Sequence, residues 1–298
     1  MKKLVVVTGG TGFIGSHTTV ELMEAGFEVL IIDDLSNSRI EVLDGIEKIT
    51  GHRPMFGKFD LCDKGKVLEC FQNHPGIAAI IHFAAHKAVP ESVDKPLMYY
   101  ENNLLSLINL LEAMKKHGVK YFVFSSSCTV YGQPDTLPVM EISPIKKAAS
   151  PYGNTKQIAE DIIQDVVSAG DPLEAILLRY FNPIGAHPSA LIGELPIGVP
   201  LNLVPFITQT AIGIREKLKV FGDDYNTPDG SAIRDYINVV DLSRAHVVSI
   251  ERLLAGNNKS ALETFNLGTG QGLSVLEIIN TREPCFTKVM GNGFKSNA

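Results

Sequence analysis

The stretch LVVVTGGTGFIG occupies residues 4–15 and joins a short apolar run to glycines at positions 9, 12 and 15. Because the chain there must turn tightly, approach a pyrophosphate and pack a helix against its strand, residues without a Cβ are needed at each point. The unpaired N–H groups and positive dipole at the start of the following helix favour phosphate. The candidate residues for binding a dinucleotide are Gly9, Gly12, Phe13, Ile14 and Gly15.

An acidic residue closes the second apolar run, Val29–Ile32. A carboxylate at Asp33 would accept hydrogen bonds from the adenosine ribose and repel a 2′-phosphate, which predicts NAD rather than NADP. Asp34 is the alternative, and the register of the strand favours Asp33. Asp60-Leu61 and His82–Ala85 follow two later runs and are candidates for lining the cofactor, although each alone is typical of any sheet end.

The pattern of apolar runs indicates the fold. Runs rich in Val, Ile and Phe, separated mostly by helix-length segments, predict a Rossmann-type, doubly wound parallel sheet covered on both faces, of the α/β class. The runs are Leu4–Val7, Val29–Ile32, Met55–Phe59, Ala79–Phe83, Tyr121–Ser125 and Ala175–Tyr180.

The amino-acid composition changes after Phe181, where frequent prolines and glycines indicate long loops of the kind that build a ligand-binding lobe. We therefore expect an NAD-binding domain over residues 1–180 and a smaller substrate-binding lobe over residues 181–298. A segment at about 234–250 is expected to pack back on the first domain.

Two intervening segments carry helical apolar stripes. Each stripe fits a face buried against the sheet or a subunit interface, and burial is the commoner case. The stripes comprise Leu104, Leu107, Ile108, Leu111 and Met114, and Ile158, Ile162, Ile163, Val166 and Val167.

A candidate catalytic group follows the fifth run. Ser125–Ser127 end that run, and Tyr152 and Lys156, four residues apart, share one face of a helix. A nearby ammonium and a positively charged nicotinamide would lower the pKa of the phenol, so that Tyr152 acts as general base. Ser127, or alternatively Thr129, would hold the substrate hydroxyl. These residues predict oxidation of a secondary alcohol by hydride transfer to the cofactor.

Composition narrows the partners. The chain has 298 residues, 45% hydrophobic, and a net charge of −6, which argues against binding nucleic acid or an anionic membrane. It contains no apolar stretch of 18 residues, which predicts no membrane span and a cytoplasmic location. Its cysteines show no metal-ligand spacing, so we expect reduced thiols, no disulfide and no metal: Cys62, Cys70, Cys128 and Cys285.

From residue 1 to about residue 279 the chain resembles the UDP-glucose 4-epimerases of the extended short-chain dehydrogenase/reductase family. The resemblance runs through Thr8–Gly15, Asn37-Ser38, Asp60, His82–Ala85, Lys87–Val89, Asn102-Asn103, Ser125–Ser127, Thr129–Gly132, Tyr152–Lys156, Tyr180–Pro183, Asn202-Leu203, Asp229-Gly230, Arg234–Ile237 and Asp241-Leu242.

The resemblance implies a reversible oxidation at C4 of the sugar in UDP-galactose or UDP-glucose. Tyr152, assisted by Ser127, would take the proton of the 4-hydroxyl, while tightly held NAD takes a hydride and returns it to the other face of the turned 4-keto sugar. Lys156 and Lys87 would contact the cofactor, and Asn102 would complete the nicotinamide side.

The resemblance also implies the residues that hold the UDP sugar, with Arg234 neutralising diphosphate charge. These are Asn182, Asn202, Leu203, Phe221 and Arg234. From the residues alone, loop packing is the preferred explanation for Asn202 or Phe221, and Arg234 could merely pair with Asp235. The family is commonly a homodimer built on the helices containing residues 102–117 and 152–167.

The resemblance stops at Asn280. Pro284 interrupts a helix expected from about Ser274, and the glycine-rich tail is expected to be poorly structured. Relatives continue with a segment that supplies another diphosphate-binding arginine, so we expect a truncated or divergent, incomplete lobe.

Two alternatives compete with an epimerase. A 4,6-dehydratase needs an acidic pair beside the strand-end serine, and Cys128-Thr129 supplies none. An NAD-binding protein with impaired or lost catalysis is the alternative from a different class, favoured by the unusual tail and opposed by the intact Ser127, Tyr152 and Lys156.

Overall fold

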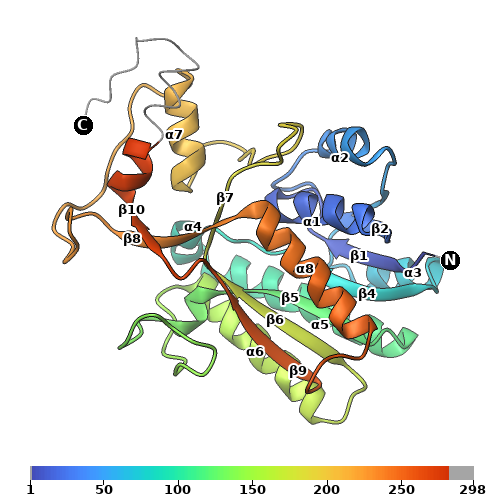
Figure 1. Ribbon diagram of the computed structural model, residues 1–298. Helices are drawn as coiled ribbons and strands as arrows, with labels where there is room; N and C mark the ends of the chain where they lie inside the picture. Colours follow the sequence, from blue (N-terminus) through green and yellow to red (C-terminus); the bar gives the residue numbers. More distant parts are fainter. Residues whose placement is uncertain (1, 282–298) are drawn as a thin grey trace.

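The computed structural model describes residues 2–281 (Figure 1); Pro284, Cys285 and the tail lie outside the described residues. Seven parallel strands form one sheet in the order β3-β2-β1-β4-β5-β6-β9. The strands are β1 (Leu4–Thr8), β2 (Glu28–Asp33), β3 (Met55–Lys58), β4 (Ile77–His82), β5 (Tyr121–Ser127), β6 (Glu174–Tyr180) and β9 (Leu262–Leu267). The order reverses at β1, which pairs with both β2 and β4, and this doubly wound arrangement confirms the predicted fold.

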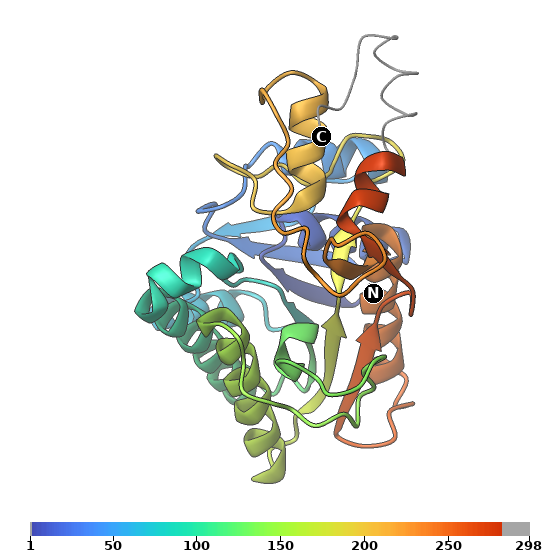
Figure 2. The same ribbon diagram turned by 90° about the vertical axis from the view of Figure 1, so that its left-hand side faces the viewer.

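Helices cover both faces of the sheet (Figures 1 and 2). Successive side chains of a strand point to opposite faces of the sheet, so the strands contribute to two hydrophobic cores. Val6 lies in the core covered by α3, α5 and α6, and Val5 lies in the core covered by α1, α2 and α8. The helices are α1 (Phe13–Glu24), α2 (Val42–Thr50), α3 (Lys64–Asn73), α4 (Val89–Asp94), α5 (Pro96–His117), α6 (Pro151–Ser168), α7 (Leu203–Ala211) and α8 (Val239–Leu254), with a 3₁₀ turn η1 (Cys128–Tyr131).

The two predicted apolar stripes lie on α5 and α6. Leu107, Leu111 and Met114 of α5 and Ile163 of α6 are buried in the core, as a face packed against the sheet requires. Ile108, in contrast, is 39% exposed. Burial therefore accounts for most of the stripe on α5 but not for all of it.

A smaller lobe stands beyond the carboxyl ends of the strands (Figures 1 and 2). It contains α7 and a three-stranded sheet, β10-β8-β7, made of β7 (Asn182–Ile184), β8 (Ile233–Asn238) and β10 (Gly272–Ser274). Ser274 and Glu277 form a reciprocal cap at the start of a helical segment at residues 275–281, which agrees with the helix expected from about Ser274.

The later part of the chain also returns to the main body. Ser243 of α8 accepts a hydrogen bond of 3.3 Å from Thr18 of α1, and Arg244 forms an ion pair of 3.1 Å with Glu21. The strand β9 then joins the main sheet beside β6, which the apolar runs did not predict. Over residues 2–281, no helix has the length and hydropathy required to cross a membrane.

Candidate functional site

The glycine-rich turn joins β1 to α1 at the point where the strand order reverses. Gly9 has a φ of +69°, and a Cβ there would lie 2.8 Å from the backbone nitrogen of Ala84. A Cβ at Gly15 would collide with the carbonyl oxygen of Gly9. The first turn of α1 carries no acidic side chain, and Gly12 caps it without a side chain. This bare cradle fits the pyrophosphate of a dinucleotide.

The carboxylate of Asp33 faces this turn. It accepts hydrogen bonds from the backbone N–H of Thr11 at 3.2 Å, from the N–H of Leu35 at 2.9 Å and from the hydroxyl of Ser38 at 3.0 Å. Asp34 is exposed and, among the described residues, binds only the N–H and hydroxyl of Ser36, at 2.8 and 2.7 Å. The geometry therefore favours Asp33 as the acid beside the cofactor's ribose.

The ends of β1 and β4 are tied together beside the glycines. Thr8 Oγ1 lies 2.7 Å from Nδ1 of His82 and accepts a hydrogen bond of 3.3 Å from the backbone N–H of Ala84. Burial, reinforced by the charge of Lys156, lowers the pKa of His82 to about 3, so this imidazole is neutral at physiological pH. At the end of β3, the side chain of Asp60 accepts from the N–H of Cys62 at 2.8 Å, and Leu61 is buried.

The three serines at the end of β5 meet the amino-terminal part of α6. Lys156 donates a hydrogen bond of 2.7 Å to the backbone oxygen of Ser125, and the hydroxyl of Ser127 is close enough to the phenol of Tyr152 to lower its pKa. Helix α6 begins here because Ser150 caps it, accepting from Gly153 N–H at 3.1 Å, with Pro151 as the first helical residue. The predicted catalytic residues Ser127, Tyr152 and Lys156 are thus brought together.

The acidity of Tyr152 differs from the sequence expectation. Burial raises its pKa to about 12, and the nearby hydroxyl of Ser127 opposes this rise only in part. From the sequence we predicted a lowered pKa, caused by the neighbouring ammonium together with a positively charged nicotinamide. Burial is the largest effect on the phenol among the described residues, and Lys156 directs its hydrogen bond to the Ser125 carbonyl.

The alternative hydroxyl, Thr129, lies in η1 beside the serines. Its Oγ1 is buried and has no hydrogen-bond partner among the described residues. A buried hydroxyl without a partner costs free energy, so it is suited to bind a group supplied by a ligand. Both Ser127 and Thr129 therefore remain candidates for holding the substrate hydroxyl.

Two residues implied by the resemblance meet at one carboxylate in the lobe. Lys87 Nζ lies 3.5 Å from Oε1 of Glu194, and Asn202 donates to the same oxygen at 2.5 Å. Asn102 hydrogen-bonds its neighbour Asn103 at 3.0 Å. The structure therefore places Lys87 and Asn202 at one point, with Asn202 at the start of α7 immediately before Leu203.

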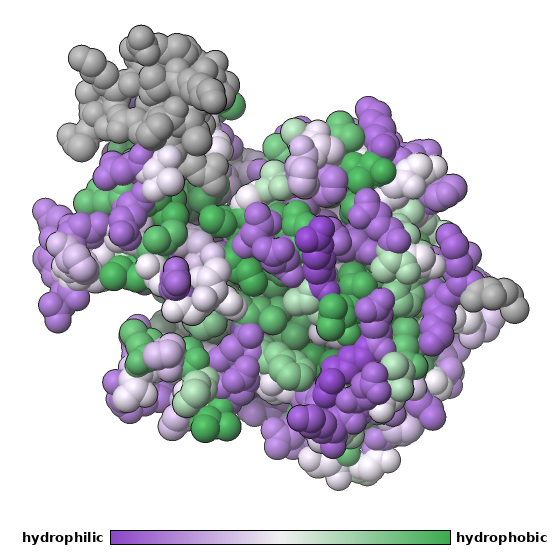
Figure 3. Space-filling view, in the orientation of Figure 1, coloured by the Kyte–Doolittle hydropathy of each residue, from purple (hydrophilic) through white to green (hydrophobic). Residues whose placement is uncertain are grey.

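The remaining lobe residues are open to solvent. Asn182 is exposed and Phe221 is 82% exposed, so packing within the lobe does not explain Phe221. Arg234 forms no ion pair with Asp235 among the described residues, because the carboxylate of Asp235 instead accepts from Thr269 and Gly270. The space-filling view shows a hollow between this lobe and the main body, with hydrophobic side chains on the lobe (Figure 3).

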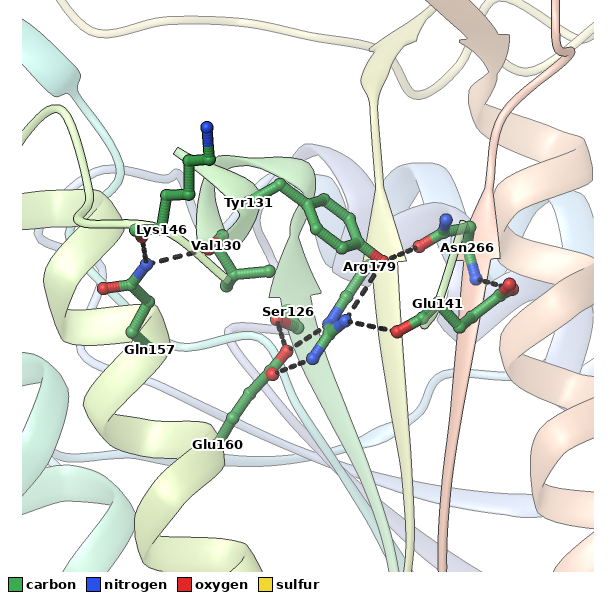
Figure 4. A network of polar contacts seen from close by, with 9 residues as sticks. All are labelled: Ser126, Val130, Tyr131, Glu141, Lys146, Gln157, Glu160, Arg179 and Asn266. Carbon is green, nitrogen blue, oxygen red and sulfur yellow. Dashed lines mark hydrogen bonds and ion pairs between the residues drawn. The ribbon is translucent and has the colours of Figure 1, made fainter. Parts of the chain in front are cut away.

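Sequence reasoning missed several residues that support the site. Asn103 joins the backbone of His86 to the hydroxyl of Thr155, at 2.8–3.1 Å, and so links α5 to α6. Glu160 and Arg179 form a buried ion pair behind the serines (Figure 4). The sequence did single out Arg179, because it is the one charged residue within the apolar run Ala175–Tyr180, where a buried charge needs a partner.

Comparisons with known proteins agree with this geometry. Residues 5–268 match the NAD dependent epimerase/dehydratase family. The chain is 50% identical to the UDP-glucose 4-epimerase of Bacillus subtilis over 287 residues, which cover 96% of this chain and 82% of that protein. The similarity to the UDP-glucose 4-epimerase of mouse, Mus musculus, is 48% over 285 residues, or 94% of this chain and 81% of that protein.

Solved structures extend the similarity to three dimensions. The UDP-glucose 4-epimerase of Bifidobacterium longum in complex with NAD+ and UDP superposes with a TM-score of 0.91 at 45% identity, covering 95% of this chain and 83% of that one. The enzyme of Stenotrophomonas maltophila with bound NAD and formylated UDP-arabinopyranose gives a TM-score of 0.90 at 48% identity, covering 95% and 82%. With its glycine-rich turn, strand-end serines and Tyr152–Lys156 pair in place, the chain belongs to the NAD-dependent epimerase/dehydratase family.

Proposed function

We propose that the chain interconverts UDP-galactose and UDP-glucose by inverting C4 of the sugar, with NAD as its cofactor. The observation that carries the proposal is the convergence of Ser127, Tyr152 and Lys156 at the end of β5, in a chain about half identical to UDP-glucose 4-epimerases. The cradle formed by Gly9, Gly12 and Gly15 fits the cofactor's pyrophosphate, and Asp33 is the acid for its ribose.

NAD, when bound, supplies the group that accepts a hydride from C4 and gives it back. Tyr152 removes the proton of the C4 hydroxyl as this carbon is oxidised to a ketone, and it returns the proton when the carbon is reduced. Ser127 stabilises the ionised phenol, in keeping with its lowering of the pKa of Tyr152. No external oxidant is consumed, because oxidation and reduction occur in one cycle.

Lys156 supports Tyr152 electrostatically. Burial lowers the pKa of its ammonium to about 8, and the charge of Glu160 opposes that lowering. At neutral pH the ammonium is therefore mostly protonated and favours the ionised form of Tyr152. Positive charge beside the phenol is needed here, because burial, its largest influence, raises the pKa of Tyr152 to about 12.

The lobe holds the UDP sugar. We assign the diphosphate to the guanidinium of Arg234, which among the described residues donates only to the backbone oxygen of Ile233, at 2.7 Å. The other residues that we assign to the UDP sugar are Asn182 at the start of β7, Asn202 and Leu203 at the start of α7, and Phe221 in the loop before β8. After oxidation the 4-keto sugar would turn over against these lobe residues and present its other face for reduction.

The test is turnover by the purified protein. UDP-galactose is added without NAD, UDP-glucose is followed by chromatography, and bound NAD is measured after denaturation. Conversion by the wild type, with none by Tyr152→Phe, supports the proposal. Bound NAD without conversion would instead support the second candidate, an NAD-binding relative with impaired catalysis.

We also propose that the protein is a homodimer that acts in the cytoplasm. Leu97, Leu105 and Ile108 of α5 are exposed, at 80%, 38% and 39%, on a helix that packs beside α6. Such an unpartnered apolar surface fits a second copy of the same helices. Cys62, Cys70 and Cys128 are free thiols, which suits a reducing compartment. Sedimentation of wild type and Leu97→Glu would test the dimer.

A further inference from the structure

A buried ion pair lies directly behind the catalytic residues. Arg179 donates to Glu160 through Nη2 at 2.5 Å and through Nε at 2.9 Å, and the two side chains are only 7% and 6% exposed. Removing both charges from water is costly, so such a pair is a weak source of stability compared with apolar side chains of similar volume. Its presence therefore calls for another physical reason.

The pair completes a set of bonds between α6 and the end of β5. Glu160 lies one helical turn after Lys156, on the same face. Ser126 donates to its carboxylate, while Ser125 accepts from Lys156. Two consecutive strand residues are thus each hydrogen-bonded to the catalytic helix, so neither element can shift along the other without breaking these bonds.

Arg179 extends these bonds to the surrounding elements (Figure 4). Its Nη1 donates to the hydroxyl of Tyr131 at 3.0 Å, and that hydroxyl donates to Asn266 of β9 at 2.6 Å. The backbone N–H of Asn266 in turn donates to Glu141 at 2.7 Å. The ion pair is therefore the centre of a network that joins α6, η1, β5, β6 and β9.

The network also sets the charge around Lys156. The buried titratable and charged groups on the elements around it include His82 on β4, Tyr99 on α5, Cys128 on η1, Tyr152 and Glu160 on α6, and Arg179 and Tyr180 on β6. Burial holds His82 neutral, and it raises the pKa of Cys128 and of the three tyrosines so that they stay protonated at neutral pH. Among the described residues, Glu160 is then the anion that acts on the buried ammonium.

We propose that Glu160, oriented by Arg179 and Ser126, is a positioning residue that fixes the Tyr152–Lys156 helix against the strand-end serines and keeps Lys156 protonated. Its catalytic consequence rests on the proposed epimerase function, whereas its effect on Lys156 does not.

Glu160→Gln tests both parts, because it keeps the shape of the side chain and removes its charge. We expect kcat to fall about ten- to a hundredfold with KM within about twofold, since the groups that act in the transition state are displaced. The high-pH limb of the kcat profile should move about one unit lower, because Lys156 loses its proton more easily without the anion.

A direct titration of Lys156 provides a readout that needs no turnover. Protein labelled with ε-13C-lysine is titrated by NMR, with Lys156→Arg to assign the signal, and the pKa of Lys156 should fall about one unit in Glu160→Gln. Glu263→Gln is the matched control, because Glu263 of β9 accepts a similar fork, at 2.7 and 2.9 Å, from Arg252 of α8. It should change neither kcat nor the titration.

The outcomes separate the two proposals. If wild type turns over and a folded Glu160→Gln keeps its kcat and the Lys156 titration, the positioning role is wrong and the epimerase function stands. If wild type does not turn over, the function is wrong and the titration alone decides the role of Glu160. If Glu160→Gln does not fold, Ser126→Ala decides: a loss of kcat at unchanged KM supports the role, and wild-type kcat overturns it.

Discussion

Lys156 Nζ donates a hydrogen bond of 2.7 Å to the backbone oxygen of Ser125, the first of the three serines that end β5. The ammonium also lies 4.7 Å from the centre of the Phe124 ring. One strand end therefore holds the lysine through its backbone and places near the tyrosine the hydroxyl of Ser127, which lowers the pKa of the phenol. The position of the Tyr152 phenol relative to the Lys156 ammonium is thus set by β5 as much as by the spacing of the two residues on α6.

Lys156→Met should reduce kcat by at least about a hundredfold, because the phenol of Tyr152 loses its cation and the Ser125 carbonyl loses its donor. In the wild type, kcat should decline as pH rises through about 8, where the folded-state pKa of Lys156 lies. Steady-state kinetics between pH 6 and pH 9.5 measures both effects. Lys115→Met is the control, since Lys115 is an exposed lysine paired with Asp171 far from the serines. If Lys156→Met kept more than a third of wild-type kcat, the assignment would be contradicted.

Gly15→Ala should weaken retention of NAD and lower the melting temperature. The new Cβ would meet the carbonyl oxygen of Gly9 and lie 2.8 Å from the Cα of Gly10, so the start of α1 must move away from the turn. Overpacking of this kind typically costs about 1–3 kcal/mol. Gly76→Ala is matched to it, because a Cβ there meets nothing within 4 Å and its φ is not positive. Equal NAD content and equal melting temperatures in the two variants would refute the predicted role of Gly15.

Asp33→Ala should bind NAD about ten- to a hundredfold more weakly than wild type, the loss expected for hydrogen bonds to a charged group. It should also discriminate less against NADP, since the repelling carboxylate is gone. Asp34→Ala removes two exposed local hydrogen bonds from Ser36 and should bind NAD within about twofold of wild type. Dissociation constants are measured by titrating each dinucleotide into cofactor-stripped protein. The reverse ranking of the two variants would assign the ribose to Asp34.

The sequence predicted the central sheet well because each of its buried strands is a separate apolar run. Strand β9 was missed for a physical reason: its residues Leu262–Leu267 are mostly half-buried at the sheet edge and include Glu263 and Asn266. Such a mixed segment reads as a loop until its long-range pairing with β6 is known. For this reason we assigned residues 262–267, with the rest of residues 181–298, to the substrate-binding lobe.

The candidate site was predictable where its chemistry is local and not where it depends on tertiary packing. The glycines, and Tyr152 with Lys156, stand in fixed spacings within single segments. Glu160 and Arg179 are brought together across two elements, and their pairing has no local spacing to reveal it. The raised pKa of Tyr152 follows from burial, which a spacing rule does not contain.

His246→Phe should make the protein less sensitive to acid. His246 is fully buried on α8, its ring packs 4.7 Å from that of Phe83, and its Nε2 has no partner among the described residues. Burial lowers its pKa from 6.5 to about 4, against the opposing hydrogen bond to Leu242.

Because the unfolded chain takes up this proton at higher pH than the folded one, the stability that His246 contributes is complete above pH 6.5 and is lost as pH falls towards 4. The loss should reach about 2 kcal/mol by pH 5. Melting temperatures at pH 7 and pH 5 should therefore differ less in His246→Phe than in wild type, whereas the exposed His52→Phe should behave like wild type. Parallel behaviour of all three proteins would show that protonation of His246 does not limit stability in acid.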